Sequence, residues 1–139
     1  MESKLSKRLA DIVGDLPLQD GIRVLEIGCG SGAMAREISR LNAKAHILAI
    51  DRSAKAIEQA ISGSQTEIEI GRLSFRQIAI EKFELEPNEK PFDIAIAVRV
   101  GALDGRHPEI EKQALLKIAK VVTKKGKLFI NGGNPLKVI

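Results

Sequence analysis

The sequence predicts an α/β fold in which about five parallel strands form an open sheet with helices on both faces. Strand-like segments alternate along the chain with segments of helical periodicity, which is the pattern of a parallel sheet. Residues 92–98 are almost entirely apolar, as expected for a strand that is buried on both faces. A glycine-rich turn lies at residues 28–32, between a strand and a helix. These features predict three layers: helices, sheet, helices.

The first third of the chain contains two helix–strand pairs. Apolar residues at helical spacing predict an opening helix over residues 2–14. Residues 22–28 are then expected to form the first strand, residues 33–41 a helix, and residues 45–50 the second strand. This second strand stops at Asp51, which is therefore placed at its carboxyl end.

The segment 53–70 must cross from one parallel strand to the next, because a tight turn cannot join such strands. We expect a helix with Ser53 as its cap. The small residues 62–64 leave open whether this helix is continuous or broken. A third strand follows at residues 73–78.

The last third of the chain completes the sheet. After the fourth strand, a loop at residues 99–107 leads to Pro108, a favoured first residue of a helix. The helix is expected to run to about Thr123 and to be closed by residues 124–126. Residues 127–131 then form the fifth strand.

Length and composition indicate one ordinary globular domain over residues 1–139. The net charge of 22 − 18 = +4 is mild, so a nucleic-acid partner is allowed but not indicated. One cysteine, Cys29, and two distant histidines, His46 and His107, predict no metal site. No apolar run is long enough to cross a bilayer. We expect a cytoplasmic chain without a membrane partner.

The glycine-rich turn is the strongest functional signal. Its residues, 26–32, read EIGCGSG, and glycines at alternate positions let a ligand approach the backbone without meeting Cβ atoms. Backbone amides at the start of the following helix favour such a ligand. Asp51 follows Gly28 by 51 − 28 = 23 residues. A carboxylate there suits the two hydroxyls of an adenosine ribose.

Spacing alone does not choose the ligand of this turn. Gly28, Gly30 and Ala33 also satisfy the looser dinucleotide pattern G-x-G-x-x-A. Glu26 argues against a pyrophosphate, because like charges about 4 Å apart at an effective dielectric of about 20 repel by roughly 4 kcal/mol. The same carboxylate would attract a ligand that carries an ammonium and a sulfonium. A cationic ligand is therefore favoured, with a nicotinamide dinucleotide as the remote alternative.

Residues 24–32 resemble the first motif of the class I S-adenosylmethionine-dependent methyltransferases. Asp51 resembles the ribose-binding acid of that family, and residues 91–94 and 125–128 resemble two further marks, at the starts of the fourth and fifth strands. The resemblance covers about residues 20–132. It implies a Rossmann-like sheet of strand order 3-2-1-4-5, S-adenosylmethionine as cofactor, and methyl transfer as the activity.

The resemblance also implies roles for the matching positions. The turn 28–32 would hold the methionine portion of the cofactor, with Glu26 near its ammonium. Asp51 would bind the ribose, Arg52 would flank the adenine, and the end of the fourth strand would lie near the reactive methyl. The expected cofactor-binding residues are Glu26, Gly28, Cys29, Gly30, Gly32, Asp51, Arg52, Ile78, Ala79, Ala97 and Val98.

Two departures from the family pattern affect these expectations. Ile78 stands where a typical member has an acid that binds the adenine amino group, so adenine would be held by apolar contact and the Ala79 amide, or by Glu81. The chain also ends at Ile139, without the usual last two strands. An uncovered fifth strand would expose unpaired backbone groups. We expect either a homodimer at that edge or cover from the opening helix or the tail.

The acceptor of the methyl group is not identified by the sequence. Transfer from a sulfonium can depend mainly on alignment, so no catalytic dyad is required. The loop 99–107 is the candidate contact: Arg99 or Arg106 could hold an anionic group, and Asp104 or His107 could accept a proton. The structural alternatives are a turn built by Asp104 and a helix cap supplied by His107. A binding domain without activity of its own is the second functional hypothesis.

Overall fold

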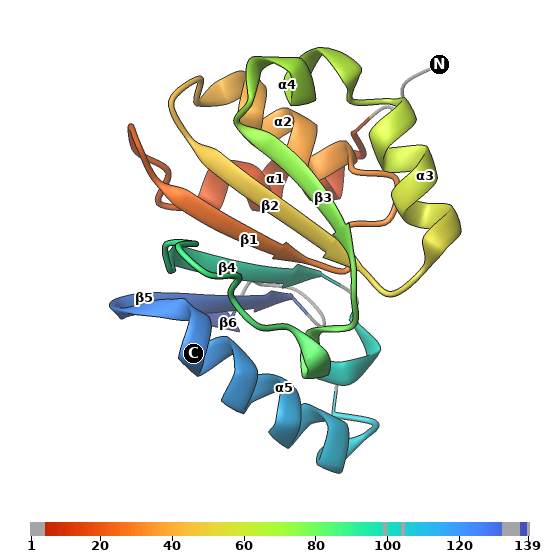
Figure 1. Ribbon diagram of the computed structural model, residues 1–139, viewed down its shortest axis with the longest axis vertical. Coiled ribbons are helices and arrows are strands. Elements are labelled where there is room, and N and C mark those ends of the chain that lie inside the picture. Colours follow the sequence, from red (N-terminus) through yellow and green to blue (C-terminus); the bar gives the residue numbers. More distant parts are fainter. Residues whose placement is uncertain (1–4, 99, 104, 132–136, 139) are drawn as a thin grey trace.

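The computed structural model describes residues 5–98, 100–103, 105–131 and 137–138, which form a six-stranded sheet of order β3-β2-β1-β4-β5-β6 (Figure 1). The first five strands are parallel, and the sixth is antiparallel to its neighbour. The expected order 3-2-1-4-5 is therefore confirmed. The strands are β1 (Arg23–Ile27), β2 (His46–Asp51), β3 (Leu73–Gln77), β4 (Phe92–Val98), β5 (Val122–Asn131) and β6 (Lys137–Val138).

Helices cover both faces of the sheet, which confirms the three layers (Figure 1). None of the helices in the described ranges is long and apolar enough to span a bilayer. Two short 3-10 helices, η1 and η2, follow β3 and β4. The helices are α1 (Lys7–Asp15), α2 (Ala33–Leu41), α3 (Ala54–Ser62), α4 (Gln65–Ile70), η1 (Ile80–Lys82), η2 (Gly101–Leu103) and α5 (Pro108–Val121).

Alternating side chains of the strands divide the core into two halves. Val24 points into the cluster with residues of α1 and α2, whereas its neighbour Leu25 points into the cluster with α5 and η1. Ile38 of α2 and Phe83, which follows η1, are fully buried on opposite faces. The central strands β1 and β4 are thus apolar on both sides, as the composition of residues 92–98 predicted.

The crossover between β2 and β3 is broken into α3 and α4 at residues 63–64. Ser53 caps α3 as expected, because its hydroxyl accepts a hydrogen bond from the Ala56 amide at 3.2 Å. The expectation of a helix over 53–70 is confirmed in its broken form.

The junction between α5 and β5 differs from the prediction. The helix ends at Val121 and the strand begins at once with Val122, so closure of the helix by residues 124–126 is wrong. Val122 pairs with Phe92, and the register then shifts so that Ile94 pairs with Lys127. The intervening residues bulge, and a Cβ at Gly126 would lie 2.7 Å from that of Val122. Gly126 is needed inside this bulge, not at a helix end.

The far edge of the sheet also differs from the prediction. Phe129 and Ile130 of β5 pair with Val138 and Lys137 of β6. The expectation that β5 is an exposed edge is wrong at these two residues, and cover by the tail is confirmed there. An antiparallel partner can be reached by a short return of the chain, whereas a parallel one needs a crossover.

We predict that Ile96→Ala lowers the free energy of unfolding by about 2–5 kcal/mol, the usual range for emptying a packed apolar site. Ile96 is fully buried at the centre of β4. Leu116→Ala on α5 is the control, because that side chain is 57% exposed, and its effect should stay within about 0.5 kcal/mol. Urea denaturation of both variants measures the difference, and equal effects would contradict this description of the core.

Candidate functional site

Two cavities meet at the carboxyl ends of the parallel strands. The first, the Asp51 cavity, has a volume of about 550 Å³ and is lined by residues of β1, β2, the segment after β3 and the start of α5. The second, the Glu26 cavity, has a volume of about 420 Å³ and is lined by α1, the glycine-rich loop and the end of β4. Gly28 lines both, so the turn between β1 and α2 joins them.

Hydrogen bonds attach the glycine-rich loop to the end of β2. The amides of Gly28 and Cys29 both donate to the Ile50 carbonyl, at 2.8 and 3.0 Å. The Gly30 amide donates to Asp51 Oδ2 at 2.9 Å, and Asp51 Oδ1 accepts from the Ser53 amide at 2.9 Å. Asp51 therefore fixes both the loop and the start of α3, a structural role that its position in the sequence did not indicate.

The glycines of the loop are required for different reasons. Gly28, Gly30 and Gly32 all have positive φ angles, of 72°, 55° and 84°. A Cβ at Gly28 would lie 2.8 Å from Val100 Cγ2, whereas a Cβ at Gly30 would meet nothing within 4 Å. Gly30, which lines the Glu26 cavity, thus leaves backbone open to a ligand, while Gly28 permits close packing against the segment after β4.

Glu26 is a buried carboxyl without a full set of partners. Its side chain is 4% exposed, and its Oε1 has no hydrogen-bond partner among the described residues. Burial raises the pKa of Glu26 from 4.5 to about 8, and the charge of Asp51 adds to this rise, while the Ala35 backbone and the Arg36 guanidinium oppose it. A cationic group in the Glu26 cavity would supply the missing partner and favour the ionised form.

The opening helix contributes to the site, which the sequence did not indicate. Ser6, Arg8 and Leu9 line the Glu26 cavity together with the loop. A cation and an acid in one cavity match the two charged ends of an amino acid. In the sequence, the only sign that this helix would line a cavity was the polar face of an amphipathic helix, which is a weak signal.

A sequence model of the family described as "Methyltransferase domain" matches residues 18–136. The chain belongs to this family. The match includes the loop, Asp51 and all five parallel strands, so the resemblance noted from the motifs is confirmed as membership of the class I methyltransferases.

Individual proteins resemble this methyltransferase domain in sequence or in fold. The mitochondrial ubiquinone biosynthesis O-methyltransferase of Dictyostelium discoideum is 28% identical over 122 residues, covering 84% of this chain and 36% of that protein. The chain thus spans about a third of that relative. A methyltransferase from Thiobacillus denitrificans in complex with S-adenosylhomocysteine superposes with a TM-score of 0.71 at 21% identity, over 94% of this chain and 50% of that one.

A [4+2]-cyclase also shares the fold. It superposes with a TM-score of 0.72 at 27% identity, over 88% of this chain and 43% of the cyclase. Similar architecture therefore accompanies more than one reaction, and the activity must be argued from the residues of the site.

The structure gathers most of the predicted cofactor residues of this methyltransferase domain around the two cavities. Arg52, Ile78 and Ala79 line the Asp51 cavity, and so does Glu81, the alternative adenine contact. Residues of the second cavity include Glu26, Cys29, Gly30 and Val98. Burial raises the pKa of the Cys29 thiol, which makes Cys29 a poor nucleophile.

Two of the expected cofactor residues have other surroundings. Ala97 is 1% exposed and packs in the core with α5, because alternate residues of β4 face opposite sides of the sheet. Gly32 lies against Ala60, Arg36 and Phe75, each 3.1 Å from the position of a Cβ. Both residues therefore pack against the protein interior next to the site, and neither lines one of its two cavities.

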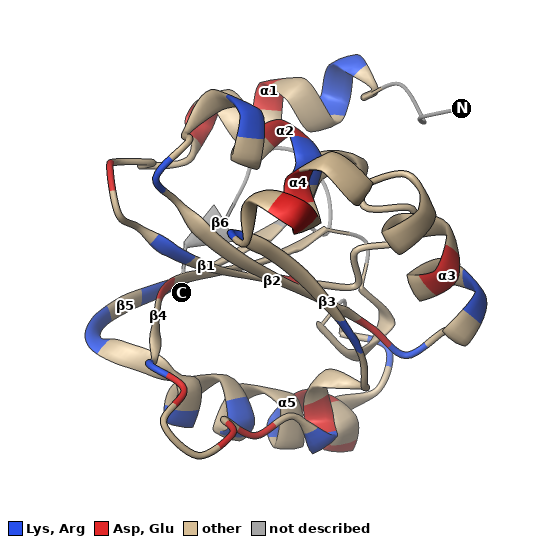
Figure 2. Ribbon diagram, turned by 45° about the horizontal axis from the view of Figure 1, so that its top comes forward, with Lys and Arg blue, Asp and Glu red and all other residues tan. Residues whose placement is uncertain are grey.

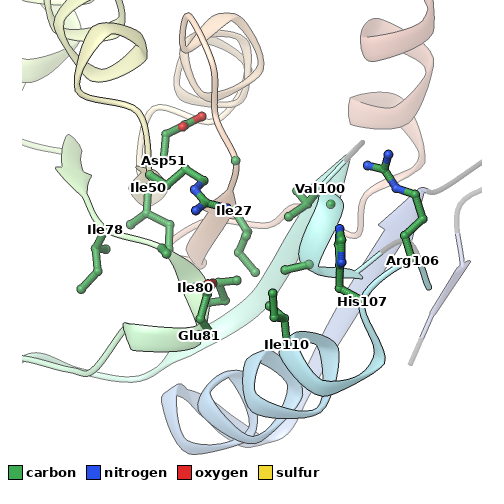
Figure 3. Close-up of a pocket in the computed structure, with 15 residues that line it drawn as sticks. Ile27, Ile50, Asp51, Ile78, Ile80, Glu81, Val100, Arg106, His107 and Ile110 are labelled. Carbon is green, nitrogen blue, oxygen red and sulfur yellow. The ribbon is translucent and has the colours of Figure 1, made fainter.

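The loop after β4 approaches the Asp51 cavity. Arg106 and His107 line it on the side opposite Asp51 and Ile78 (Figure 3). His107 occupies the N-cap position of α5, where its carbonyl accepts from the Glu111 amide at 2.9 Å, but its side chain makes no capping hydrogen bond. Arg99 and Asp104 lie outside the described residues.

We predict that Gly28→Ala destabilises the protein by at least about 1 kcal/mol more than Gly21→Ala. Both glycines have a similar positive φ, 72° and 77°, so both variants carry the same backbone cost. Only the new methyl at position 28 collides with Val100, since nothing lies within 4 Å at Gly21. Chemical denaturation of the two variants tests this, and equal losses would show that Val100 moves aside freely.

We predict that Glu26 makes the ligand-free protein less stable as pH rises. Its folded pKa of about 8 exceeds 4.5, so between these values the folded state holds a proton that the unfolded state has lost. The free energy of unfolding should then fall by up to about 1.4 kcal/mol per pH unit. Glu26→Gln should remove this slope, and Glu58→Gln, at an exposed position on α3, should retain it. A slope that survives Glu26→Gln would contradict the assignment.

Proposed function

We propose that this chain binds S-adenosylmethionine and transfers its methyl group to an acceptor. The observation that carries the proposal is the buried, unpartnered Oε1 of Glu26 beside a loop whose Gly30 backbone is open. A buried carboxyl in this position favours a cationic ligand and disfavours a diphosphate. The fold, the family membership and the S-adenosylhomocysteine bound to a structural neighbour support the same ligand.

The two cavities suit the two halves of this cofactor. In the Glu26 cavity, Glu26 would accept hydrogen bonds from the ammonium, and Arg8 would face the carboxylate. In the Asp51 cavity, Asp51 retains lone pairs for the ribose hydroxyls beyond the amides it already holds. Ile78 offers an apolar surface to the adenine, and Glu81 or the Ala79 amide would bind its polar edge.

The cofactor would supply an electrophilic methyl group on a positively charged sulfur, with S-adenosylhomocysteine as the leaving group when the acceptor bonds to the methyl carbon. The protein's contribution is then alignment and exclusion of water. Val98, at the end of β4, lines the cavity that holds Glu26 and Arg8, so the acceptor would approach on that side. Arg106 and His107 line the Asp51 cavity instead, and we assign them to the adenosine side of the site.

A cofactor-binding domain without activity of its own is the second candidate. Ile78 replaces the acid expected to bind the adenine amino group. Saturable binding of S-adenosylhomocysteine without methylation of any acceptor would favour this candidate. Hydroxyl-bearing acceptors are the first to assay, because the relative from Dictyostelium discoideum is named as an O-methyltransferase.

A homodimer and a cytoplasmic location stay predictions of the sequence. The pairing of β6 with β5 leaves less of that edge open for a second copy. Basic and acidic residues are interspersed on the helices of both faces, so a nucleic-acid partner gains no specific support (Figure 2). Sedimentation at tens of micromolar tests the dimer directly, and a monomer there would exclude it.

We predict that Glu26→Gln weakens binding of S-adenosylhomocysteine at least tenfold, because a hydrogen bond to a charged group contributes about 1.5–3 kcal/mol. Binding of 5′-methylthioadenosine, which lacks the amino-acid end, should change less than twofold. Glu58→Gln should leave both affinities unchanged. Calorimetry with both ligands and with NAD measures this. Loss of both adenosine ligands, or tight binding of NAD, would contradict the proposed site.

A further inference from the structure

Arg36 is a buried cation behind the glycine-rich loop. It belongs to α2 and is 1% exposed. Its Nη1 donates to the Ser31 carbonyl at 2.8 Å and to the Ser64 hydroxyl at 2.9 Å. Its Nε has no hydrogen-bond partner within the described part of the chain. This side chain thus links the loop to the junction between α3 and α4.

The chain leaves space for this guanidinium on two sides. A Cβ at Gly32 and a Cβ at Gly63 would each lie 3.1 Å from Arg36 Nη1. Ser64 is fully buried and lies where the helix between β2 and β3 is broken. The break at residues 63–64 therefore provides both the room and one of the two acceptors of Arg36.

No carboxylate of the described residues forms an ion pair with Arg36 within 4 Å. A buried charge without a counter-ion is costly, so its surroundings should show a compensating group. Glu26 becomes such a group when it is ionised: the Arg36 charge lowers the pKa of Glu26, opposing the effect of burial. The two side chains flank the same loop without direct contact.

We propose that Arg36 is a positioning residue of the cofactor site, which holds the Ser31 carbonyl in place and serves as the long-range counter-charge of the Glu26 carboxylate. This inference rests on the proposed function, because Glu26 needs its charge only for a cationic ligand. Arg36 itself lies behind the loop and would not touch the ligand.

Other charged groups around Glu26 act in different directions. From β2, Asp51 raises the pKa of Glu26, whereas Arg36 from α2 lowers it. Arg8 of α1 lines the same cavity, on the ligand side. The Cys29 thiol of the loop is neutral, because burial raises its pKa. Among these described residues, Arg36 is thus the buried positive charge behind the loop.

The test compares Arg36→Gln, Arg36→Lys and Ser64→Ala with Arg40→Gln, which removes an arginine at an exposed position of the same helix. The first readout is the titration of the Glu26 carboxyl carbon by NMR in the ligand-free protein. The second is the dissociation constant of S-adenosylhomocysteine as a function of pH.

Arg36→Gln should raise the Glu26 titration midpoint by at least half a pH unit and weaken binding at pH 7 at least fivefold. Arg36→Lys should keep the midpoint within about 0.3 pH unit of the wild type, because the charge remains. Ser64→Ala should lower the unfolding temperature without moving the midpoint, and Arg40→Gln should leave the midpoint unchanged. Should Arg36→Gln not fold, Arg36→Met, which keeps an unbranched side chain without the charge, takes its place and should raise the midpoint in the same way.

An unchanged midpoint in Arg36→Gln, or in Arg36→Met where the first variant does not fold, would overturn the proposal, as would an Arg36→Lys midpoint equal to that of the uncharged variant. Failure of the proposed function looks different. In that case the wild type would not bind S-adenosylhomocysteine, while the ligand-free titration would still report the coupling of Arg36 to Glu26.

Discussion

The attachment of the glycine-rich loop to the end of β2 is the interaction on which the site depends. Two successive amides, those of Gly28 and Cys29, share the Ile50 carbonyl, and the next glycine amide binds Asp51. These bonds can form only if β1 and β2 are parallel neighbours that end at the same edge. The sheet therefore fixes the shape of the loop before any ligand arrives, and the two cavities on either side of Gly28 follow from that shape.

The burial of Glu26 connects stability with binding. Removing a carboxyl from water disfavours its charged form, and the effect is seen in its raised pKa. The same poorly polarisable surroundings strengthen the attraction to a cation that enters the cavity. A ligand that binds only the folded state also stabilises it. Under the proposed function, the burial that makes the ligand-free domain less stable also favours a positively charged ligand.

Two helices bring polar residues to the site because their apolar faces pack on the sheet, and sequence motifs do not predict this packing. The opening helix α1 brings Arg8 to the Glu26 cavity because its apolar face, with Ile12 and Val13, packs on the sheet. The start of α5 brings His107 to the Asp51 cavity in the same way, because Ala114 and Ile118 are buried beneath it. Neither contribution follows from the identity of the polar residue alone.

Local residue patterns predicted the strands, the loop and the placement of Glu26 and Asp51, whereas the strand order came from the resemblance to the family. The first three depend on local spacing: apolar runs set the strands, and glycines and acids at fixed offsets from strand ends set the loop. Tertiary structure alone decided the bulge around Gly126, the pairing of β6, the core position of Ala97 and the burial of Arg36. Each of these depends on which distant segments come into contact, and no local pattern of residues records that.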